Sequence, residues 1–160
     1  MSEQPAAPQD AGQPQPVFSI DKLYVKDLSL EIPNAPQVFL ERESPQVDLQ
    51  IHNDASQLSD GVFHAVLTAT VTAKVKDKTM FLIEVAQAGI FQIRNFPAQD
   101  MELVLAVACP NVLLPYLREV VSDACLRAGF PPVILAPMNF EALYYQRKQQ
   151  AAAAPAVGQA

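Results

Sequence analysis

Apolar and polar residues alternate in four segments between residues 17 and 93. Side chains of a strand point alternately to its two faces, so the alternation predicts strands that each bury one face. The first segment, 17–32, is expected to bury Phe18, Ile20, Tyr24, Leu28, Leu30 and Ile32, with Leu23 and Val25 as exposed apolar exceptions. With further segments at 45–54, 62–75 and 80–93, the pattern predicts an antiparallel sheet with one solvated face.

The connection between the first two strands is too long for a hairpin. It spans residues 33–46, PNAPQVFLERESPQ, and contains three prolines. Connections of this length inside a compact domain are usually functional or cross over the sheet. Because Val38 and Phe39 are apolar and belong to no strand, we expect a crossover loop that covers the domain.

A long helical pattern follows the strands. It begins near Gln99 and ends at Gly129, a typical helix-terminating residue. Proline lacks the amide hydrogen that a helix interior needs. The sequence therefore predicts a break near Cys109, just before Pro110, and a bend near Pro115.

A short C-terminal helix is expected after an extended stretch. Asn139 is a typical N-cap residue, because its side chain can accept a hydrogen bond from the first turn. Phe140, Leu143 and Tyr144 share one face of this helix. That face either docks the helix onto the sheet or binds a ligand.

The long helix carries more apolar surface than one sheet requires. Its two adjacent stripes are Leu113, Leu117, Val120 and Ala124, and Leu114, Val121, Cys125 and Ala128. A helix on a single sheet needs an apolar face of about 100°. Either the helix lies deep in a monomer or copies of the chain associate, and an unpaired first strand favours association. The expected interface residues are Leu23, Val25, Leu114, Val121 and Cys125.

Composition excludes several classes of function. The chain has 160 residues, a net charge of −6 and a pI of about 4.8, so it lacks the basic surface that nucleic acids or anionic membranes attract. Residues 1–16 and 149–160 are expected to be disordered tails around a domain at 17–148. No secretory signal or apolar run of about 18 residues stands out, which favours a cytoplasmic protein without direct membrane insertion.

No catalytic constellation stands out either. The five glycines are scattered, so no phosphate-binding loop is expected, and no residues suggest a metal or another cofactor. Cys109 and Cys125 are expected to be reduced, buried thiols. His52 and His64 are expected to be solvated. The sequence thus favours a binding protein over an enzyme.

Four segments closely resemble the SecB family of bacterial protein-export chaperones. They are YVKDLSLEIPNAP (24–36), AGIFQI (88–93), CPNVLLPYLRE (109–119) and LAPMNFEALY (135–144). The resemblance runs in order over about 18–146. It implies an α+β fold with a four-stranded antiparallel Greek-key sheet, a crossover loop after strand one, one long broken helix and one short C-terminal helix. It also implies a homotetramer, a dimer of dimers.

The resemblance further implies a chaperone that needs no ATP, holds unfolded preproteins in an export-competent state and delivers them to the SecA motor. The implied peptide-binding residues are Phe39, Met138, Phe140, Leu143 and Tyr144. The implied SecA-binding residues are Asp27, Glu31, Leu82 and Glu84. The alternation places these four on the solvated sheet face, where acidic groups would attract the basic, zinc-bearing tail of SecA. Glu43 replaces an aromatic residue found in some relatives.

Two alternatives remain open. A small oligomeric enzyme, such as a thioesterase of the hot-dog type, would also combine a sheet with a helix. However, its helix comes early in the chain, whereas the long helix here follows all four strands. A protein that only assembles with itself is the other alternative, and it predicts no suppression of client aggregation.

Overall fold

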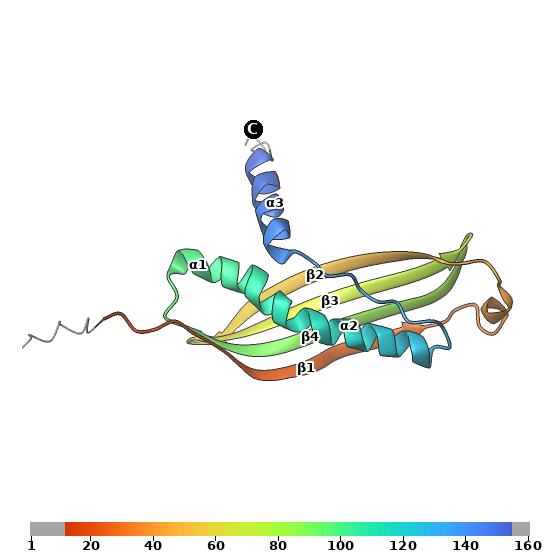
Figure 1. Ribbon diagram of the computed structural model, residues 1–160, viewed down its shortest axis with the longest axis horizontal. Helices are drawn as coiled ribbons and strands as arrows, with labels where there is room; N and C mark the ends of the chain where they lie inside the picture. The colour runs from red at the N-terminus through yellow and green to blue at the C-terminus, as the bar shows by residue number, and fades with distance from the viewer. Residues whose placement is uncertain (1–11, 155–160) are drawn as a thin grey trace, which may run out of the picture.

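Four antiparallel strands form one sheet in the spatial order β1-β4-β3-β2 (Figure 1). The computed structural model describes residues 12–154. The elements in chain order are β1 (Val17–Glu31), the 3-10 turn η1 (Gln37–Leu40), β2 (Gln46–Ser59), β3 (Val62–Val75), β4 (Lys78–Arg94), α1 (Ala98–Leu103), the π-helical segment η2 (Val104–Ala108), α2 (Cys109–Arg127) and α3 (Phe140–Ala153).

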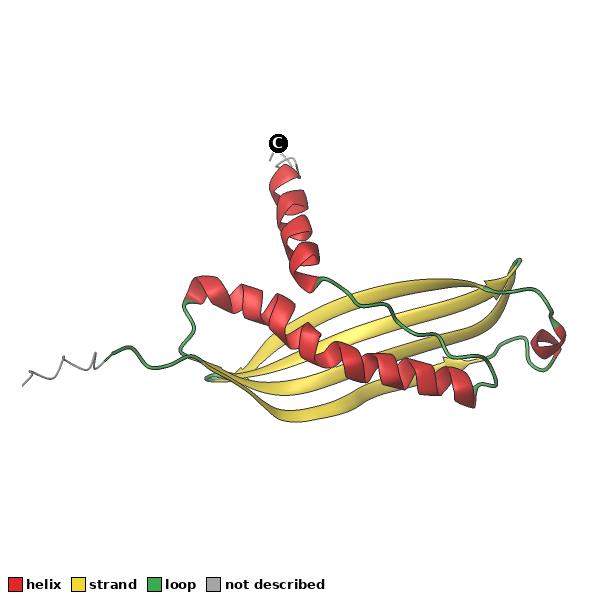
Figure 2. Ribbon diagram, in the orientation of Figure 1, coloured by secondary structure: helices red, strands yellow, loops and turns green. Residues whose placement is uncertain are grey.

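The sheet has Greek-key connectivity. Hairpins join β2, β3 and β4, while β1 returns beside β4 through the long connection that contains η1. The predicted sheet, crossover loop and order of elements are therefore confirmed. Figure 2 shows two layers, with the α1–η2–α2 helix lying along one face of the sheet.

The core lies between α2 and the facing side of β3 and β4. Its fully buried side chains include Leu67, Val71, Ile83, Val85, Leu113, Leu117 and Val121. Burial of one such side chain stabilises the fold by about 1.5–3 kcal/mol. The faces predicted for β2, β3 and β4 are confirmed, because the inward residues of each strand pair with one another; Leu49, for example, pairs with Val71.

Two bulges in β1 correct the predicted face of that strand. The register shifts between Ile20 and Lys22 and again between Val25 and Asp27. Paired residues of antiparallel strands share a face, so the helix-side residues of β1 are Phe18, Ile20, Leu23, Val25, Leu28 and Leu30. Leu23 and Val25 are thus regular members of the apolar face, while Tyr24 lies on the outer face, where its hydroxyl is 2.6 Å from His64 Nε2.

The long helix is continuous from Ala98 to Arg127. The predicted break near Cys109 is instead the π-helical segment η2, and the helix continues through Pro115. At the other end the predicted stop is confirmed. Gly129 has φ +85°, its N–H donates to Leu126 O, and the N–H of Phe130 donates to Cys125 O. These two bonds form a Schellman motif.

The C-terminal helix α3 stands away from the sheet (Figure 1). Asn139 caps it as predicted, because Asn139 Oδ1 accepts a hydrogen bond of 2.9 Å from the N–H of Ala142. The helix continues to Ala153, past the predicted domain boundary at residue 148. Most of the predicted N-terminal tail and the end of the C-terminal tail, residues 1–11 and 155–160, lie outside the described residues.

Candidate binding surfaces

A cavity of about 240 Å³ lies between β2 and the base of α3. It is lined by Leu49, Ile51, Asn53, Ala106, Met138, Phe140, Leu143, Tyr144 and Arg147. Four of the five residues expected to bind peptide therefore come together here. Phe140 is only 5% exposed and docks α3 on the core, while Met138, Leu143 and Tyr144 are half-buried and accessible to a ligand.

A second cavity of about 460 Å³ adjoins the first on the side of α1. Both are lined by Asn53, Ala106, Tyr144 and Arg147. The Tyr144 hydroxyl donates to Glu102 Oε2 at 3.0 Å, and Lys148 Nζ lies 3.7 Å from the same oxygen. Exposed polar contacts thus join α3 to α1 beside apolar residues that line the second cavity, such as Ala55 and Leu105.

Phe39 is the predicted peptide-binding residue that does not reach these cavities. It lies on η1, is 48% exposed and stacks on Phe130 with ring centroids 5.1 Å apart. Val38, its neighbour, is 2% exposed and anchors the crossover loop in the core. Phe39 therefore marks a separate apolar position at the end of the molecule where β2 begins.

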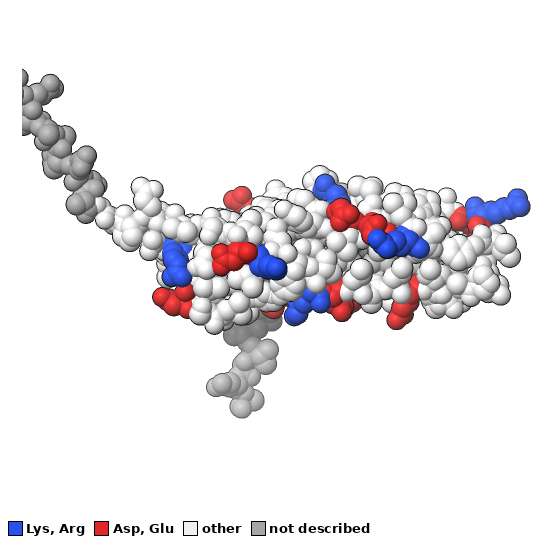
Figure 3. Space-filling view, turned by 90° about the horizontal axis from the view of Figure 1, so that it is seen from below, with Lys and Arg blue, Asp and Glu red and all other residues white. Residues whose placement is uncertain are grey.

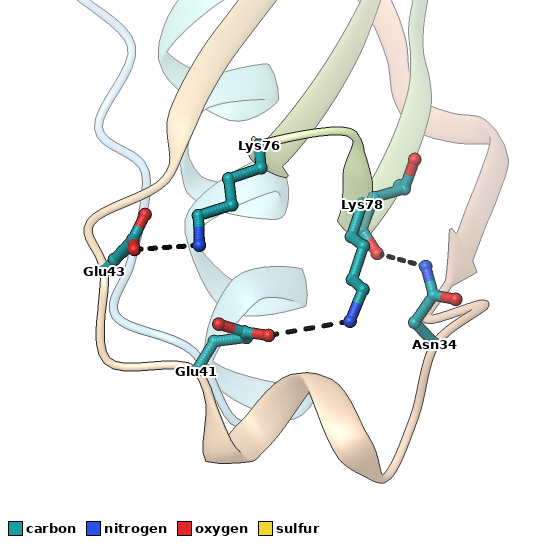
Figure 4. Close-up of polar contacts among 6 residues, drawn as sticks. Asn34, Glu41, Glu43, Lys76 and Lys78 are labelled. Atoms are coloured by element: carbon teal, nitrogen blue, oxygen red, sulfur yellow. Dashed lines mark hydrogen bonds and ion pairs between the residues drawn. The ribbon is translucent and has the colours of Figure 1, made fainter.

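The crossover loop is held against the β3–β4 hairpin by polar contacts (Figure 4). Lys76 Nζ lies 3.2 Å from Glu43 Oε1, and Lys78 Nζ lies 3.8 Å from Glu41 Oε1. At the start of the loop, Asn34 Nδ2 donates to the Thr79 carbonyl at 2.9 Å. Glu43 thus takes part in an ion pair that orders the loop.

Four further apolar side chains are exposed on η1, on β2 and in the segment after α2, and one of them, Leu49, also lines the cavity at the base of α3, called the α3 cavity below. They are Leu40 (80% exposed), Val47 (45%), Leu49 (38%) and Ile134 (64%). The segment after α2, which carries Ile134, runs back across the sheet toward β2 and α3 (Figure 1). We call these four residues and Phe39 the β2-side track. Sequence patterning had assigned Val47 and Leu49 to the buried face and had not singled out Leu40 or Ile134.

The four residues expected to bind SecA lie on the outer face of the sheet, on neighbouring strands. Glu31 pairs with Leu82, Ser29 with Glu84, and Asp27 with Ala86. Thr70 Oγ1 donates to Glu84 Oε2 at 3.3 Å from the other side. Seen from the β1 edge, acidic and basic side chains are interspersed (Figure 3). The carboxylates of Asp27, Glu31 and Glu84 thus belong to a surface that carries both acidic and basic side chains.

The residues expected at subunit interfaces fall into two groups. Val25 is 43% exposed and Leu23 is half-buried, both on the β1 edge strand. Leu114, Val121 and Cys125 are 6%, 0% and 0% exposed, so these three fill the subunit's own core and have almost no surface left for a partner. The exposed apolar residues of α2 are instead Tyr116 and Leu126.

The long helix still has surplus apolar surface. The helix Ala98–Arg127 is long and apolar enough, by length and composition alone, to cross a membrane, and only 33% of its most apolar stretch is buried. In the structure this helix packs along the sheet. Part of its apolar surface, at half-buried residues and at Tyr116 and Leu126, is therefore available for contacts beyond the subunit.

Both cysteines are free and buried, as predicted. Burial raises the pKa of the Cys109 thiol from 9.0 to about 12 and also raises the pKa of Cys125. A thiol with a raised pKa stays protonated near neutral pH and is a poor nucleophile. Within residues 12–154, no group of three or more His, Cys, Asp or Glu side chains is placed to hold a metal ion.

Comparison with known proteins identifies the family. The family model described as "Preprotein translocase subunit SecB" matches residues 11–151. Protein-export protein SecB of Nitrosospira multiformis is 65% identical over 86% of this chain and 87% of its own length. The same-named proteins of Methylobacillus flagellatus (57%; 96% of each chain) and Chromobacterium violaceum (64%; 88% of this chain, 93% of its own) are also similar.

Among solved structures, a SecB-like chaperone of Mycobacterium tuberculosis in complex with an antitoxin peptide has a TM-score of 0.64 at 16% identity. The match covers 76% of this chain and 91% of that one, which shows a shared fold. The family match spans nearly all of the described residues, including both edge strands and most of α3. This chain therefore belongs to the SecB family of protein-export chaperones.

Proposed function

We propose that this chain binds unfolded preproteins in the cytoplasm, without ATP, and delivers them to the SecA motor for export. The observation that carries the proposal is the β2-side track together with the α3 cavity. Large exposed apolar patches on soluble proteins usually mark interaction sites. Here five apolar side chains of η1, β2 and the segment after α2 are between 38% and 80% exposed, and Leu49 of β2 also lines that cavity.

The chemistry of this surface suits a non-native chain. Each apolar client side chain that becomes buried contributes about 1.5–3 kcal/mol. Phe39 offers a rigid aromatic face, while Met138 is flexible and adapts to different side chains. A protein that binds only the unfolded state shifts the folding equilibrium without chemical energy. Folded clients are ignored because their apolar side chains are already buried.

Self-association would strengthen this binding. We propose a homotetramer, a dimer of dimers, in which β1 strands pair between subunits and the surplus apolar surface of the long helix is covered. Several copies of the track would then engage one client. Weak contacts multiply when they act on the same chain, because the later contacts form at high effective concentration.

The outer sheet face is the proposed contact for SecA. Glu31 pairs with Leu82, and Glu84 and Asp27 lie further along the same face of β4 and β1. A basic, zinc-bearing tail of SecA would be attracted by the carboxylates and would bury the leucine. Because this face lies opposite the helix layer, client and motor would occupy different faces of the subunit.

A binding experiment tests the client site. A reductively unfolded polypeptide should bind without nucleotide, whereas its folded form should not. Phe39→Ser should weaken that binding about tenfold, the equivalent of 1.4 kcal/mol. The control is Leu58→Ser, because Leu58 is 56% exposed at the opposite end of β2. Equal affinity for the folded form, or equal loss in both variants, would refute the assignment.

The thioesterase alternative is not favoured. The long helix follows all four strands in the structure, unlike the early helix of a hot-dog fold. The two thiols are buried and their pKa values are raised. We infer that the chain acts by binding and not by catalysis. An acyl-thioester hydrolysis assay, with turnover above the buffer rate as the contrary result, tests this inference.

A further inference from the structure

The π-helical segment leaves one carbonyl without a partner in the helix. The N–H of Cys109 donates to Val104 O, five residues back, rather than to Leu105 O. The residue five positions after Leu105 is Pro110, which has no N–H. Asn53 of β2 provides the missing donor, because its Nδ2 lies 3.4 Å from Leu105 O.

This contact fixes the orientation of the Asn53 amide. A carbonyl oxygen can only accept a hydrogen bond, so the nitrogen of the amide must face Leu105. Asn53 Oδ1 therefore points elsewhere. It is buried, and it has no hydrogen-bond partner among the described residues. A buried acceptor without a donor raises the free energy of the unliganded state.

The position of Asn53 indicates which donor would satisfy it. Asn53 lines both cavities beside α3, between apolar residues such as Ile51 and Leu143. It also lies on β2, an edge strand of the sheet, and the free edge of β2 pairs with no strand of the described chain. An extended polypeptide brings apolar side chains and regularly spaced N–H groups to the same place.

We propose that Asn53 Oδ1 accepts a main-chain N–H from an extended apolar client segment bound between β2 and α3. This role rests on the proposed function and deepens it. Asn53 would recognise the backbone rather than a side chain, so almost any client residue is accepted at that position. Proline is the exception, because it has no N–H to donate.

We expect access to Asn53 Oδ1 to come from a small displacement of α3, whose residues line the same two cavities. The oxygen has almost no accessible surface in the unliganded chain. On the cavity side, α3 is held by Phe140, Leu143 and the Tyr144–Glu102 hydrogen bond. Lys148 adds an exposed ion pair to Glu102. Because Leu143 and Tyr144 are only half-buried, a client can displace the turn that follows Phe140 while Phe140 stays in the core. Client binding should then increase hydrogen exchange at the amides of 142–145, the first that are hydrogen-bonded in this helix.

A double-mutant cycle between chaperone and client tests the proposal. The probe is a synthetic extended apolar peptide, prepared unmodified and with a single N-methyl group at each successive amide. The unmodified chain should lose about tenfold in affinity at one methylated position, the equivalent of 1.4 kcal/mol. Asn53→Leu should bind the parent peptide about tenfold more weakly and lose nothing further at that position.

The matched control is His52→Leu, which changes the neighbouring side chain on the outer face of β2. This variant should keep the full position-dependent loss. Asn53→Ala provides a second variant if the leucine disturbs the fold, and the methyl scan on the unmodified chain needs no variant. Equal losses at all methylated positions, or additive effects in the cycle, would overturn the role of Asn53. No binding of the parent peptide would overturn the proposed client site itself.

Discussion

The ring of Phe39 stacks on the ring of Phe130, with centroids 5.1 Å apart and planes inclined by 21°. Phe130 in turn packs on Phe81 of β4 at 4.9 Å. This stack connects the crossover loop to the end of α2 and to the sheet. The conformation of Gly129 brings Phe130 into place, so a helix terminator and a proposed client residue depend on one another.

Gly129→Ala should destabilise the subunit. Gly129 has φ +85°, and a Cβ added there would lie 3.3 Å from Phe39 Cε1. A non-glycine residue in a left-handed conformation costs about 1–2 kcal/mol, and the Phe39 ring must also shift. Gly129→Asn should cost less in backbone strain, because asparagine tolerates this conformation better. Urea unfolding measures both variants, and an unchanged midpoint for Gly129→Ala would contradict the expectation.

The ion pairs of the crossover loop should control its opening rather than overall stability. Both pairs are exposed, so each contributes at most about 1 kcal/mol. Lys76→Glu should repel Glu43 and increase hydrogen exchange at the Val38 amide at low salt. The charge swap Lys76→Glu with Glu43→Lys should restore protection. The difference should fade in high salt, and a salt-independent difference would point to packing instead.

Val25→Lys should weaken self-association. Val25 is 43% exposed on the β1 edge, where a charge opposes pairing of two apolar surfaces. Val47→Lys is the matched control, because Val47 is 45% exposed on the opposite edge strand. Sedimentation should show a smaller assembly for Val25→Lys alone. Equal dissociation in both variants would argue against a β1 interface.

Reversing two charges on the outer face should separate SecA binding from client binding. Asp27→Lys with Glu31→Lys should weaken binding of SecA at low salt and leave the affinity for an unfolded client unchanged. Asp48→Lys with Asp54→Lys is the control, because these acids lie on the same face on β2. Unchanged SecA affinity in the first variant would remove the assigned contact.

Cys109 should reduce stability at alkaline pH. Burial raises its folded-state pKa to about 12, against 9.0 when the thiol is solvated. Its contribution is therefore fully present below pH 9.0 and is lost as the pH rises toward 12. The decrease is at most about 1.4 kcal/mol per pH unit. Urea unfolding of the unmodified chain and Cys109→Ala between pH 8 and 10.5 should show a shallower decline for the variant.

The sequence predicted the sheet, the crossover loop, the end of α2 and the start of α3, because these features depend on local patterns. The alternation in β3 and β4, the N-cap Asn139 and the terminator Gly129 each act within a few residues. The orientation of Tyr24 was not predictable in this way. A bulge reverses which face a strand residue occupies, and the pairing register that produces it belongs to β4 as much as to β1.

The candidate sites were predictable in part. Met138, Phe140, Leu143 and Tyr144 share a cavity because they lie close together in the chain. Leu114, Val121 and Cys125 are apolar residues on a helix face, and the sequence does not say whether that face meets the subunit's own sheet or another subunit. Asn53 gave no signal, because the role proposed for it depends on Pro110, far away in the sequence.

Because of the bulges in β1, the two edges of the sheet differ in how well they can pair with an added strand. Along β1, a regular strand would lose its pairing at Asp21 and again at Lys26, so only a partner with matching interruptions can pair along the full length. The pairing of β2 is uninterrupted from Gln46 to Gln57. The β1 edge therefore favours a partner that carries the same bulges, as a second copy of this chain would, whereas the β2 edge places no such requirement on an added strand.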